Sequence, residues 1–153
     1  MQSNRRNIKK ASKSDLPALE EIFRLEFSKP PYNEKWGSKL AAQKIGKYFR
    51  TCTIMVCREK KEIAGFIIFH TDYWFAGKIC FIDELVVREA FRGKGAGSAL
   101  LSQVEAEARK RKMKSTYLLA LHGCPAQEFY EKHGYNENNW VLMRKQLNPT
   151  ASI

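Results

Sequence analysis

The chain has 153 residues and a formal net charge of +11, with 44% hydrophobic and 28% charged residues. This length predicts one domain over residues 1–153, large enough to bury a core. No apolar run approaches the ~20 residues of a membrane span, and the basic N-terminus lacks the apolar stretch of a signal peptide. The four cysteines form no C-x-x-C pair, so we expect a cytoplasmic protein without disulfides or membrane contact.

Apolar periodicity and turn residues predict strands and helices along the whole chain. The expected strands are Asn7–Ala11, Thr51–Arg58, Ile63–His70, Lys78–Val87, Ser115–Leu121 and Trp140–Gln146. The expected helices run from Asp15, a candidate N-cap, to Pro30, from Ser38 to Phe49, from Ala96 to the basic run that begins at Arg109, and from Pro125 to His133. Turns are expected at Glu59–Glu62 and Asp72–Gly77, and a loose tail at Asn148–Ile153.

The stretch Ile82–Leu101 organises the rest of the chain. An apolar run that ends at Val87 predicts a buried strand, and a helical pattern begins near Ala96. Between them stand three glycines that leave the backbone open to close approach, Gly93, Gly95 and Gly97. The first N–H groups of a helix have no acceptor within it, and the helix dipole is positive there. The stretch predicts a phosphate-binding loop, with an ordinary strand-to-helix turn as the alternative.

The spacing of these residues distinguishes between kinds of phosphate loop. A mononucleotide P-loop needs Ser or Thr after its Lys, whereas Gly95 follows Lys94, and a dinucleotide fingerprint needs a third glycine where Ser98 stands. The pattern that fits is Arg-x-x-Gly-x-Gly, preceded by Leu-x-Val, at Arg92, Gly95, Gly97, Leu85 and Val87. In this pattern the stretch resembles the coenzyme A pyrophosphate loop of the GCN5-related N-acetyltransferase (GNAT) superfamily.

A second motif strengthens that resemblance. The run from Ala126 to Tyr135 reads Ala-x-x-Phe-Tyr-Glu-Lys-x-Gly-Tyr, which is similar to the other GNAT signature and follows the loop at a compatible distance. The resemblance covers most of the chain. It implies an α+β fold, with a mixed, mostly antiparallel sheet of six to seven strands, splayed at the central strands and flanked by about four helices. It also implies acetyl-coenzyme A as cosubstrate, with no metal.

The resemblance assigns cofactor contacts to the strand, the loop and the second motif. The residues implied are Leu85, Val86, Val87, Arg92, Gly93, Lys94, Gly95, Ala96, Gly97, Ser98 and Lys132. The family often has an Asn three residues before the motif Ala, and Gly123 stands there instead, which removes one coenzyme contact. In the family, the motif Tyr lies near the thioester sulfur, so the resemblance makes Tyr130 a candidate proton donor to the leaving thiolate, with a packing role as the alternative.

The acceptor amine has its own chemical requirement. An alkylamine must lose a proton before it attacks a thioester, which costs about 4.6 kcal/mol at pH 7 for a pKa of ~10.4. Asp83 and Glu84 are adjacent carboxylates in an apolar strand, and they point to opposite faces unless a bulge intervenes. We expect Asp83 to act as base and Glu84 to orient the amine, with a structural salt bridge as the alternative for both.

The nature of the acceptor is left open by the residues alone. Aromatic and acidic loop residues resemble the acceptor side of aminoglycoside-type and polyamine-type members and are predicted to bind a small cationic amine; they are Tyr32, Glu34, Trp36, Tyr73 and Trp74. A protein N-terminus or lysine is the competing acceptor, and a coenzyme A sensor without chemistry is a further alternative. Nucleic acid is a minority interpretation of the basic clusters, a homodimer is left open, and no metal is expected because His70, His122 and His133 lack ligand spacing.

Overall fold

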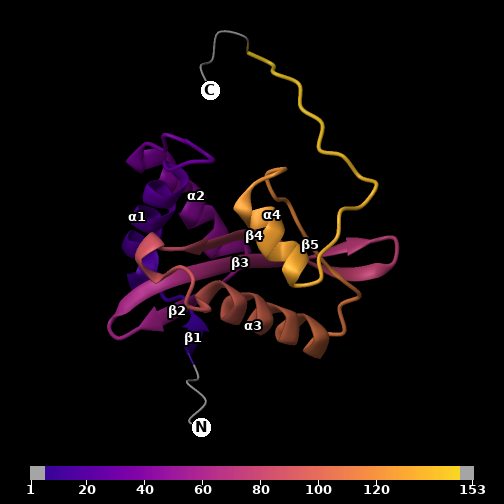
Figure 1. The fold of residues 1–153 in the computed structure, drawn as a ribbon, viewed down its shortest axis with the longest axis horizontal. Helices are drawn as coiled ribbons and strands as arrows, with labels where there is room; N and C mark the ends of the chain where they lie inside the picture. Colours follow the sequence, from indigo (N-terminus) through magenta and orange to yellow (C-terminus); the bar gives the residue numbers. More distant parts are fainter. Residues whose placement is uncertain (1–5, 149–153) are drawn as a thin grey trace. The chain divides into compact units, whose positions relative to one another are not determined.

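A computed structural model describes residues 6–148 (Figure 1). The chain forms two compact units, Met1–Ala120 and Leu121–Ile153. The prediction of one domain over residues 1–153 stays a prediction. The first unit contains a five-stranded sheet and three long helices, and the second contains one short helix.

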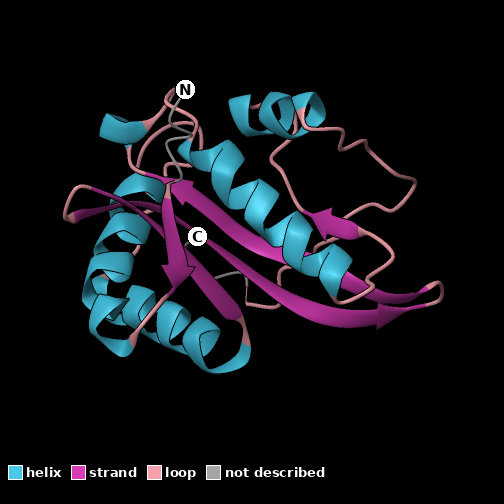
Figure 2. Ribbon diagram, turned by 90° about the horizontal axis from the view of Figure 1, so that it is seen from below, coloured by secondary structure: helices cyan, strands magenta, loops and turns pink. Residues whose placement is uncertain are grey.

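The sheet has the strand order β1-β2-β3-β4-β5. Its strands are β1 (Asn7–Lys10), β2 (Thr53–Glu59), β3 (Glu62–Trp74), β4 (Gly77–Val87) and β5 (Thr116–Leu118). The first four strands pair antiparallel, and β5 pairs parallel with β4. A two-residue turn joins β2 to β3, with Lys60 in the left-handed region at φ 57°. Figure 2 shows the long β3–β4 hairpin extending beyond the rest of the sheet.

The helices are α1 (Leu16–Phe27), α2 (Ser38–Thr51), α3 (Ala96–Lys110) and, in the second unit, α4 (Pro125–Lys132). Two short 3-10 turns, Lys13–Asp15 and Glu89–Phe91, precede α1 and the glycine loop. Pro17 and Pro125 both lie in the first turn of their helices, where a missing N–H has no cost. The four helices lie close to the predicted ranges.

The sheet buries a different set of side chains on each face because strand side chains alternate. On one face, Phe66 and Ile68 of β3 pack with Leu19 and Phe23 of α1 and with Ile45 of α2. Ile67, between them, is also fully buried. Its side chain points to the other face of the sheet, and α3 contacts β2, β3 and β4. Figure 1 shows α1 and α2 on one side of the sheet and α3 on the other. Apolar side chains therefore pack against both faces of the sheet around β3.

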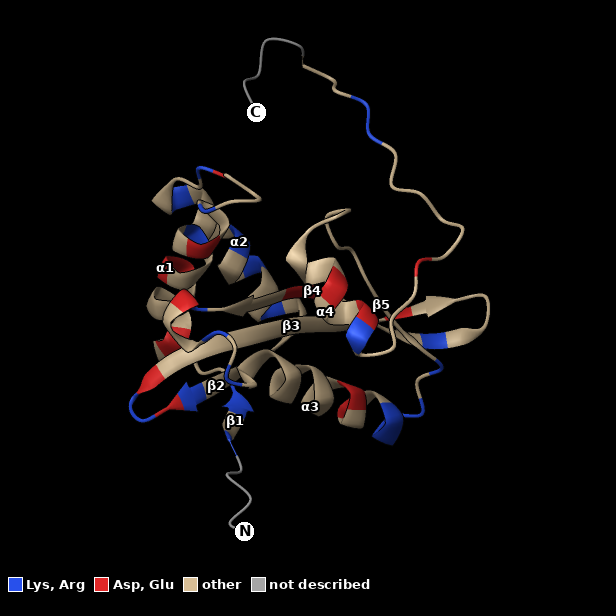
Figure 3. Cartoon of the chain, viewed as in Figure 1, with Lys and Arg blue, Asp and Glu red and all other residues tan. Residues whose placement is uncertain are grey.

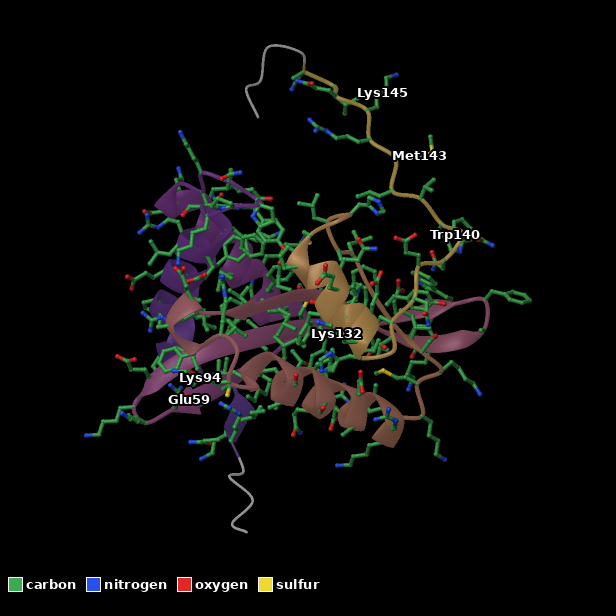
Figure 4. All side chains as sticks on the ribbon, viewed as in Figure 1. Glu59, Lys94, Lys132, Trp140, Met143 and Lys145 are labelled. Carbon is green, nitrogen blue, oxygen red and sulfur yellow. The ribbon has the colours of Figure 1, made fainter. Side chains whose placement is uncertain are left out.

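The number of strands differs from the prediction of six to seven, because the described residues form five. The segment Trp140–Gln146 has strand composition but forms no ladder, and its side chains are exposed, Trp140 by 82% and Met143 by 86% (Figure 4). Local composition cannot make a strand without a neighbouring edge to pair with. The loose tail predicted at Asn148–Ile153 lies, after Asn148, outside the described residues.

The predicted turn at Asp72–Gly77 is also too wide. Asp72, Tyr73 and Trp74 continue β3 and pair across to β4, so that only Phe75 and Ala76 connect the two strands. Aromatic residues are common in β-strands, and here Tyr73 and Trp74 form the end of β3 rather than part of a loop.

Two further properties concern the described residues as a whole. None of their helices is long and apolar enough to cross a membrane. The four cysteines are free thiols, and three of them, Cys57, Cys80 and Cys124, are buried.

The basic run after α3 is partly neutralised by its own helix. Glu105 and Arg109 pair at 3.6 Å, and Glu107 and Arg111 at 2.7 Å, each one helical turn apart. Figure 3 shows acidic and basic bands succeeding each other at this end of α3. A helix C-terminus also favours cations, so local electrostatics account for part of this basic run.

Asp15 forms a buried polar contact at the start of α1. Its carboxylate accepts hydrogen bonds from the Ser12 N–H at 2.8 Å and from Arg58 of β2 at 2.5 Å. Asp15 stands at the N-cap position of α1, as predicted, but its side chain closes the preceding 3-10 turn and makes no capping hydrogen bond to α1. Burial raises the pKa of the Asp15 carboxyl, but the hydrogen bonds from Ser12 and Arg58 outweigh burial, so this pKa lies below its usual value.

We expect Asp15→Asn to lower the free energy of unfolding at pH 7 by about 1 kcal/mol, because the amide cannot accept both charge-assisted bonds. A carboxyl with a depressed folded-state pKa stabilises above its unfolded pKa, and this stabilisation is lost as the pH falls through the folded value. The difference in the free energy of unfolding between Asp15→Asn and wild type should therefore shrink below about pH 3.9. Urea unfolding at several pH values measures this, with the exposed acid change Glu21→Gln as control. Equal stability of Asp15→Asn and wild type at pH 7 would contradict the assignment.

Candidate functional site

A β-bulge in β4 determines how its two acids point. Ile68 of β3 pairs with Glu84 and the next residue, Phe69, pairs with Ile82, so Asp83 is an extra residue in β4. Glu84 shares a face with Ile68, and the α1–α2 core lies on that face. Asp83 also contacts residues on that side, because its carboxylate lies near Cys52 at the end of α2 and His70 of β3. The bulge thus brings two consecutive carboxylates to the same face of the sheet.

Glu84 lies among three side chains of the α2 region. The Tyr48 hydroxyl donates to Glu84 Oε1 at 3.0 Å, and Lys44 Nζ lies 3.7 Å from the same oxygen. Lys44 Nζ is also 4.9 Å from the centroid of the Tyr48 ring and 5.6 Å from that of the Trp36 ring. A primary ammonium is therefore held by one carboxylate and two aromatic faces. We call Trp36, Tyr48 and Glu84 the ammonium cage.

Burial dominates the ionisation of this cage. Burial raises the pKa of the Glu84 carboxyl, and the charges of Asp83 and Glu34 add to this, while Lys44 and Tyr48 act in the opposite direction without cancelling it. The pKa of the Tyr48 hydroxyl is raised, first by burial and then by the neighbouring Glu84 charge. Tyr48 is thus a hydrogen-bond donor at neutral pH, and Glu84 is a stronger base than an exposed carboxylate.

Asp83 has a different set of partners. His70 Nδ1 lies 2.6 Å from Asp83 Oδ2, and Cys52 Sγ lies 3.9 Å from the same oxygen. The thiol, imidazole and carboxylate each place one polar atom within 4.8 Å of the others. Sequence reasoning missed this cluster because its three residues lie far apart in the chain. Burial raises the pKa of the Cys52 thiol, and Asp83 adds to this, which keeps Cys52 a protonated thiol.

The glycine loop has the backbone form that the sequence predicts. Gly95 is the N-cap of α3 with φ 87° and ψ 6°, and Gly93 has φ 71°; both lie in the left-handed region that favours glycine. A Cβ atom at Gly93 would meet nothing within 4 Å. The first turn of α3 carries no acidic side chain. The loop and helix start can therefore receive an anionic group without a repelling charge.

Two arginines fix the loop from outside. Arg92 forms an ion pair with Glu26 of α1 and donates from Nε to the Val87 carbonyl at 3.1 Å. Arg6 contacts the Glu59 carboxylate and the Lys94 carbonyl, and Figure 4 shows Glu59 and Lys94 close together. Arg92 therefore anchors the loop to α1 through the Glu26 carboxylate. Its predicted contact with the cofactor stays a prediction. Sequence reasoning missed Arg6, because it precedes the loop by more than eighty residues.

The second half of β4 has one open edge. β5 pairs with β4 only at Cys80, Phe81 and Ile82. Beyond Ile82, within the described residues, β4 has a strand neighbour on its β3 side only. The predicted cofactor residues of this strand, Leu85, Val86 and Val87, lie on that open stretch, directly before the loop. Pairing between β4 and β5 thus ends at Ile82, and the predicted splay of these strands stays a prediction.

The predicted acceptor residues fall into two groups. Glu34 Oε2 accepts from Trp36 Nε1 at 2.6 Å, and Tyr32 packs against Phe27, so the loop before α2 lies beside the ammonium cage. Tyr73 and Trp74 lie at the tip of the β3–β4 hairpin, where the Trp74 ring contacts that of Tyr117 at 4.2 Å. At ~3.3 Å per residue, Tyr73 is about 13 Å along β3 from Phe69 at the bulge. The structure brings Trp36 and Glu34 to the surroundings of Glu84. Tyr32 packs on Phe27 of α1, and Tyr73 and Trp74 lie at the hairpin tip.

Tyr130 and Lys132 belong to α4 in the second unit. The Tyr130 ring is partly buried and stacks edge-on with Phe129 and Tyr135. The Tyr130 carbonyl accepts from the His133 and Tyr135 N–H groups, which closes the helix at Gly134 with φ 88°. The roles of Tyr130 and Lys132 toward a cofactor stay predictions.

Four functional neighbours were missed by sequence reasoning: Lys44, Tyr48, Cys52 and His70. The helical spacing of Lys44 and Tyr48, four residues apart, places them on one helix face and was a usable signal. The sequence contains no comparable signal for Cys52 and His70, because only the fold brings these residues to Asp83.

Comparison with known proteins agrees with this geometry. Residues 16–135 match the sequence profile of the Acetyltransferase (GNAT) family. A possible acetyltransferase from Clostridium difficile 630 superposes with a TM-score of 0.82 at 13% identity, covering 94% of this chain and 98% of that one. A ribosomal-protein-alanine N-acetyltransferase from Brucella melitensis biovar Abortus 2308 gives 0.74 at 16% identity, over 94% and 99%. An acetyltransferase from Trypanosoma brucei gives 0.71 at 22% identity, over 93% and 99%. At these identities the likeness to solved structures shows the fold.

We expect Gly95→Ala to lower the free energy of unfolding by about 1 kcal/mol, because a Cβ atom makes the left-handed conformation costly. Crowding contributes little, since the nearest atom to the added Cβ is Arg6 Nη2 at 3.6 Å. Gly37→Ala is the matched control: Gly37 is also a helix N-cap, but it has φ −69° and open space around it. That variant should stay within about 0.5 kcal/mol of wild type in chemical denaturation. Equal losses in both variants would contradict the conformational argument.

Proposed function

Because the chain belongs to the acetyltransferase (GNAT) family, we propose that it transfers an acetyl group from acetyl-coenzyme A to a primary amine of a small cationic molecule. The observation that carries the acceptor class is the ammonium cage, which holds the Lys44 ammonium between Trp36, Tyr48 and Glu84. A site that holds one alkylammonium has the chemistry to hold another of the same kind.

The loop supports the cosubstrate. Gly93 and Gly95 leave the backbone open, and the α3 N-terminus favours the negative charge of a pyrophosphate. Lys94, Gly97 and Ser98 complete the proposed cradle, with Ala96 buried beneath it. The open β4 edge at Leu85–Val87 offers backbone groups to the pantetheine arm. When bound, acetyl-coenzyme A supplies an activated acyl carbon and a thiol leaving group.

The β4 carboxylates supply the proton acceptor in this proposal. The sequence favours Asp83 as base, but Asp83 is bonded to His70, while Glu84 lies beside the ammonium. We therefore place proton acceptance on Glu84 and give Asp83 a positioning role, through the bulge that it creates. Tyr130 is proposed as the group that protonates the leaving sulfur.

A protein N-terminus is the second candidate acceptor, since the chain shares its fold with the Brucella ribosomal-protein-alanine N-acetyltransferase. An amine panel scored by release of free coenzyme A thiol separates the candidates. We expect polyamines or aminoglycosides to release thiol faster than alanine-initiated peptides or lysine peptides. Faster release with the peptides would reassign the acceptor to protein. Tight coenzyme A binding without release above hydrolysis for any amine would contradict the enzyme and indicate a sensor.

We expect Glu84→Gln to lower kcat by about 100-fold, within the range of general base catalysis, while coenzyme A affinity changes little. Asp83→Asn should lose less, because Glu84 and the bulge remain. Steady-state rates at saturating amine, with calorimetric coenzyme A affinities, measure both effects. Full activity in Glu84→Gln together with a large loss in Asp83→Asn would restore Asp83 as the base. Thermal melts of the two variants provide the control for folding.

A further inference from the structure

The Lys44 side chain occupies the position that the proposed acceptor would take. Its Nζ atom is 3.7 Å from Glu84 Oε1 and stands over the Tyr48 and Trp36 rings. Glu84 directly precedes the open β4 edge proposed to hold the pantetheine arm. We propose that Lys44 is itself an acetylation site, modified within the same chain at the ammonium cage. This inference rests on the proposed function.

The chemistry is the same as for an external amine. The Lys44 ammonium gives one proton to the Glu84 carboxylate, and the neutral nitrogen attacks the acetyl carbonyl. The carbon–sulfur bond of the thioester breaks as the amide bond to Nζ forms. Coenzyme A leaves as the thiolate, and the thiolate takes up the second proton, which the nitrogen loses as the amide forms. One acetyl group is transferred for each thiol released, and no other reactant is needed.

The product would remain compatible with its surroundings but lose its charge. An acetyl-lysine has no ammonium to pair with Glu84 or to attract the aromatic faces. The amide and methyl groups can still pack against the rings of Trp36 and Tyr48. Acetylation of Lys44 therefore replaces its ion pair with Glu84 by a neutral side chain that still occupies the cage.

Two other lysines of α2 provide an internal comparison. Lys39 and Lys47 are exposed, whereas the Lys44 side chain is 32% exposed. Unassisted acetylation by a thioester favours the most accessible amines. Faster modification of the least accessible lysine on the helix therefore identifies assistance by the site.

The experiment incubates the purified full-length chain with acetyl-coenzyme A, without added amine, and maps acetyl-lysine by peptide mass spectrometry over time. We expect Lys44 to be modified at least about tenfold faster than Lys39 and Lys47, with a rate independent of protein concentration. Glu84→Gln should slow it by about 100-fold, the scale of general base catalysis. Lys44→Arg, which keeps the positive charge, should remove this label. Urea-unfolded protein should show no preference for Lys44.

Label spread over Lys39 and Lys47, or an equal Lys44 label in unfolded protein, would overturn the inference. The comparison of Lys44 with Lys39 and Lys47 is made in the wild-type protein, so it remains decisive even if a variant misfolds. An added polyamine or aminoglycoside is assayed in parallel by thiol release. Turnover of that amine with Lys44 unmodified would overturn the inference and leave the proposed function intact. If the protein neither turns over the added amine nor labels Lys44, both the inference and the proposed function are contradicted.

Discussion

The bulge at Asp83 is the constraint on which the site depends. Without an extra residue in β4, Asp83 and Glu84 would point to opposite faces, one of them into the α3 layer. With it, both carboxylates reach the α2 side, where Glu84 meets Tyr48 and Asp83 meets His70. The same point of the strand is where pairing with β5 ends. One local irregularity thus arranges the acids and leaves the next part of β4 with an open edge.

The loop depends on this strand and on side chains from distant segments. β4 runs into the loop at Arg88, and the Arg92 guanidinium ties the loop to Glu26 of α1. Arg6 adds a contact from the segment before β1. The left-handed backbone of Gly95 begins α3, while the Arg92–Glu26 ion pair ties the loop to α1 and Arg6 ties it to β2. The glycine loop and the acid pair are therefore both positioned by β4.

The sequence predicted most of the fold because its signals are local. Periodicity and prolines located α1, α2, α3 and α4 closely, and the spacing of Arg92, Gly95 and Gly97 identified the loop. The prediction of a sixth strand at Trp140–Gln146 was wrong, since pairing depends on an edge that composition does not reveal. Asp83 and Glu84 were recognised as a pair, but their shared face follows from a register shift across β3. Lys44 and His70 became neighbours of the acids only through tertiary packing, which no single segment encodes.

Binding of coenzyme A tests the central claim most directly, because the proposal places this cofactor on the loop and on the open strand edge. Calorimetric titration of coenzyme A into the wild-type chain and into Gly95→Val is the decisive measurement. The account predicts one site per chain in the wild type and at least about tenfold weaker binding in the variant, since a β-branched residue resists positive φ and blocks the backbone. Absence of binding in the folded wild type, or equal affinity in both proteins, would contradict it.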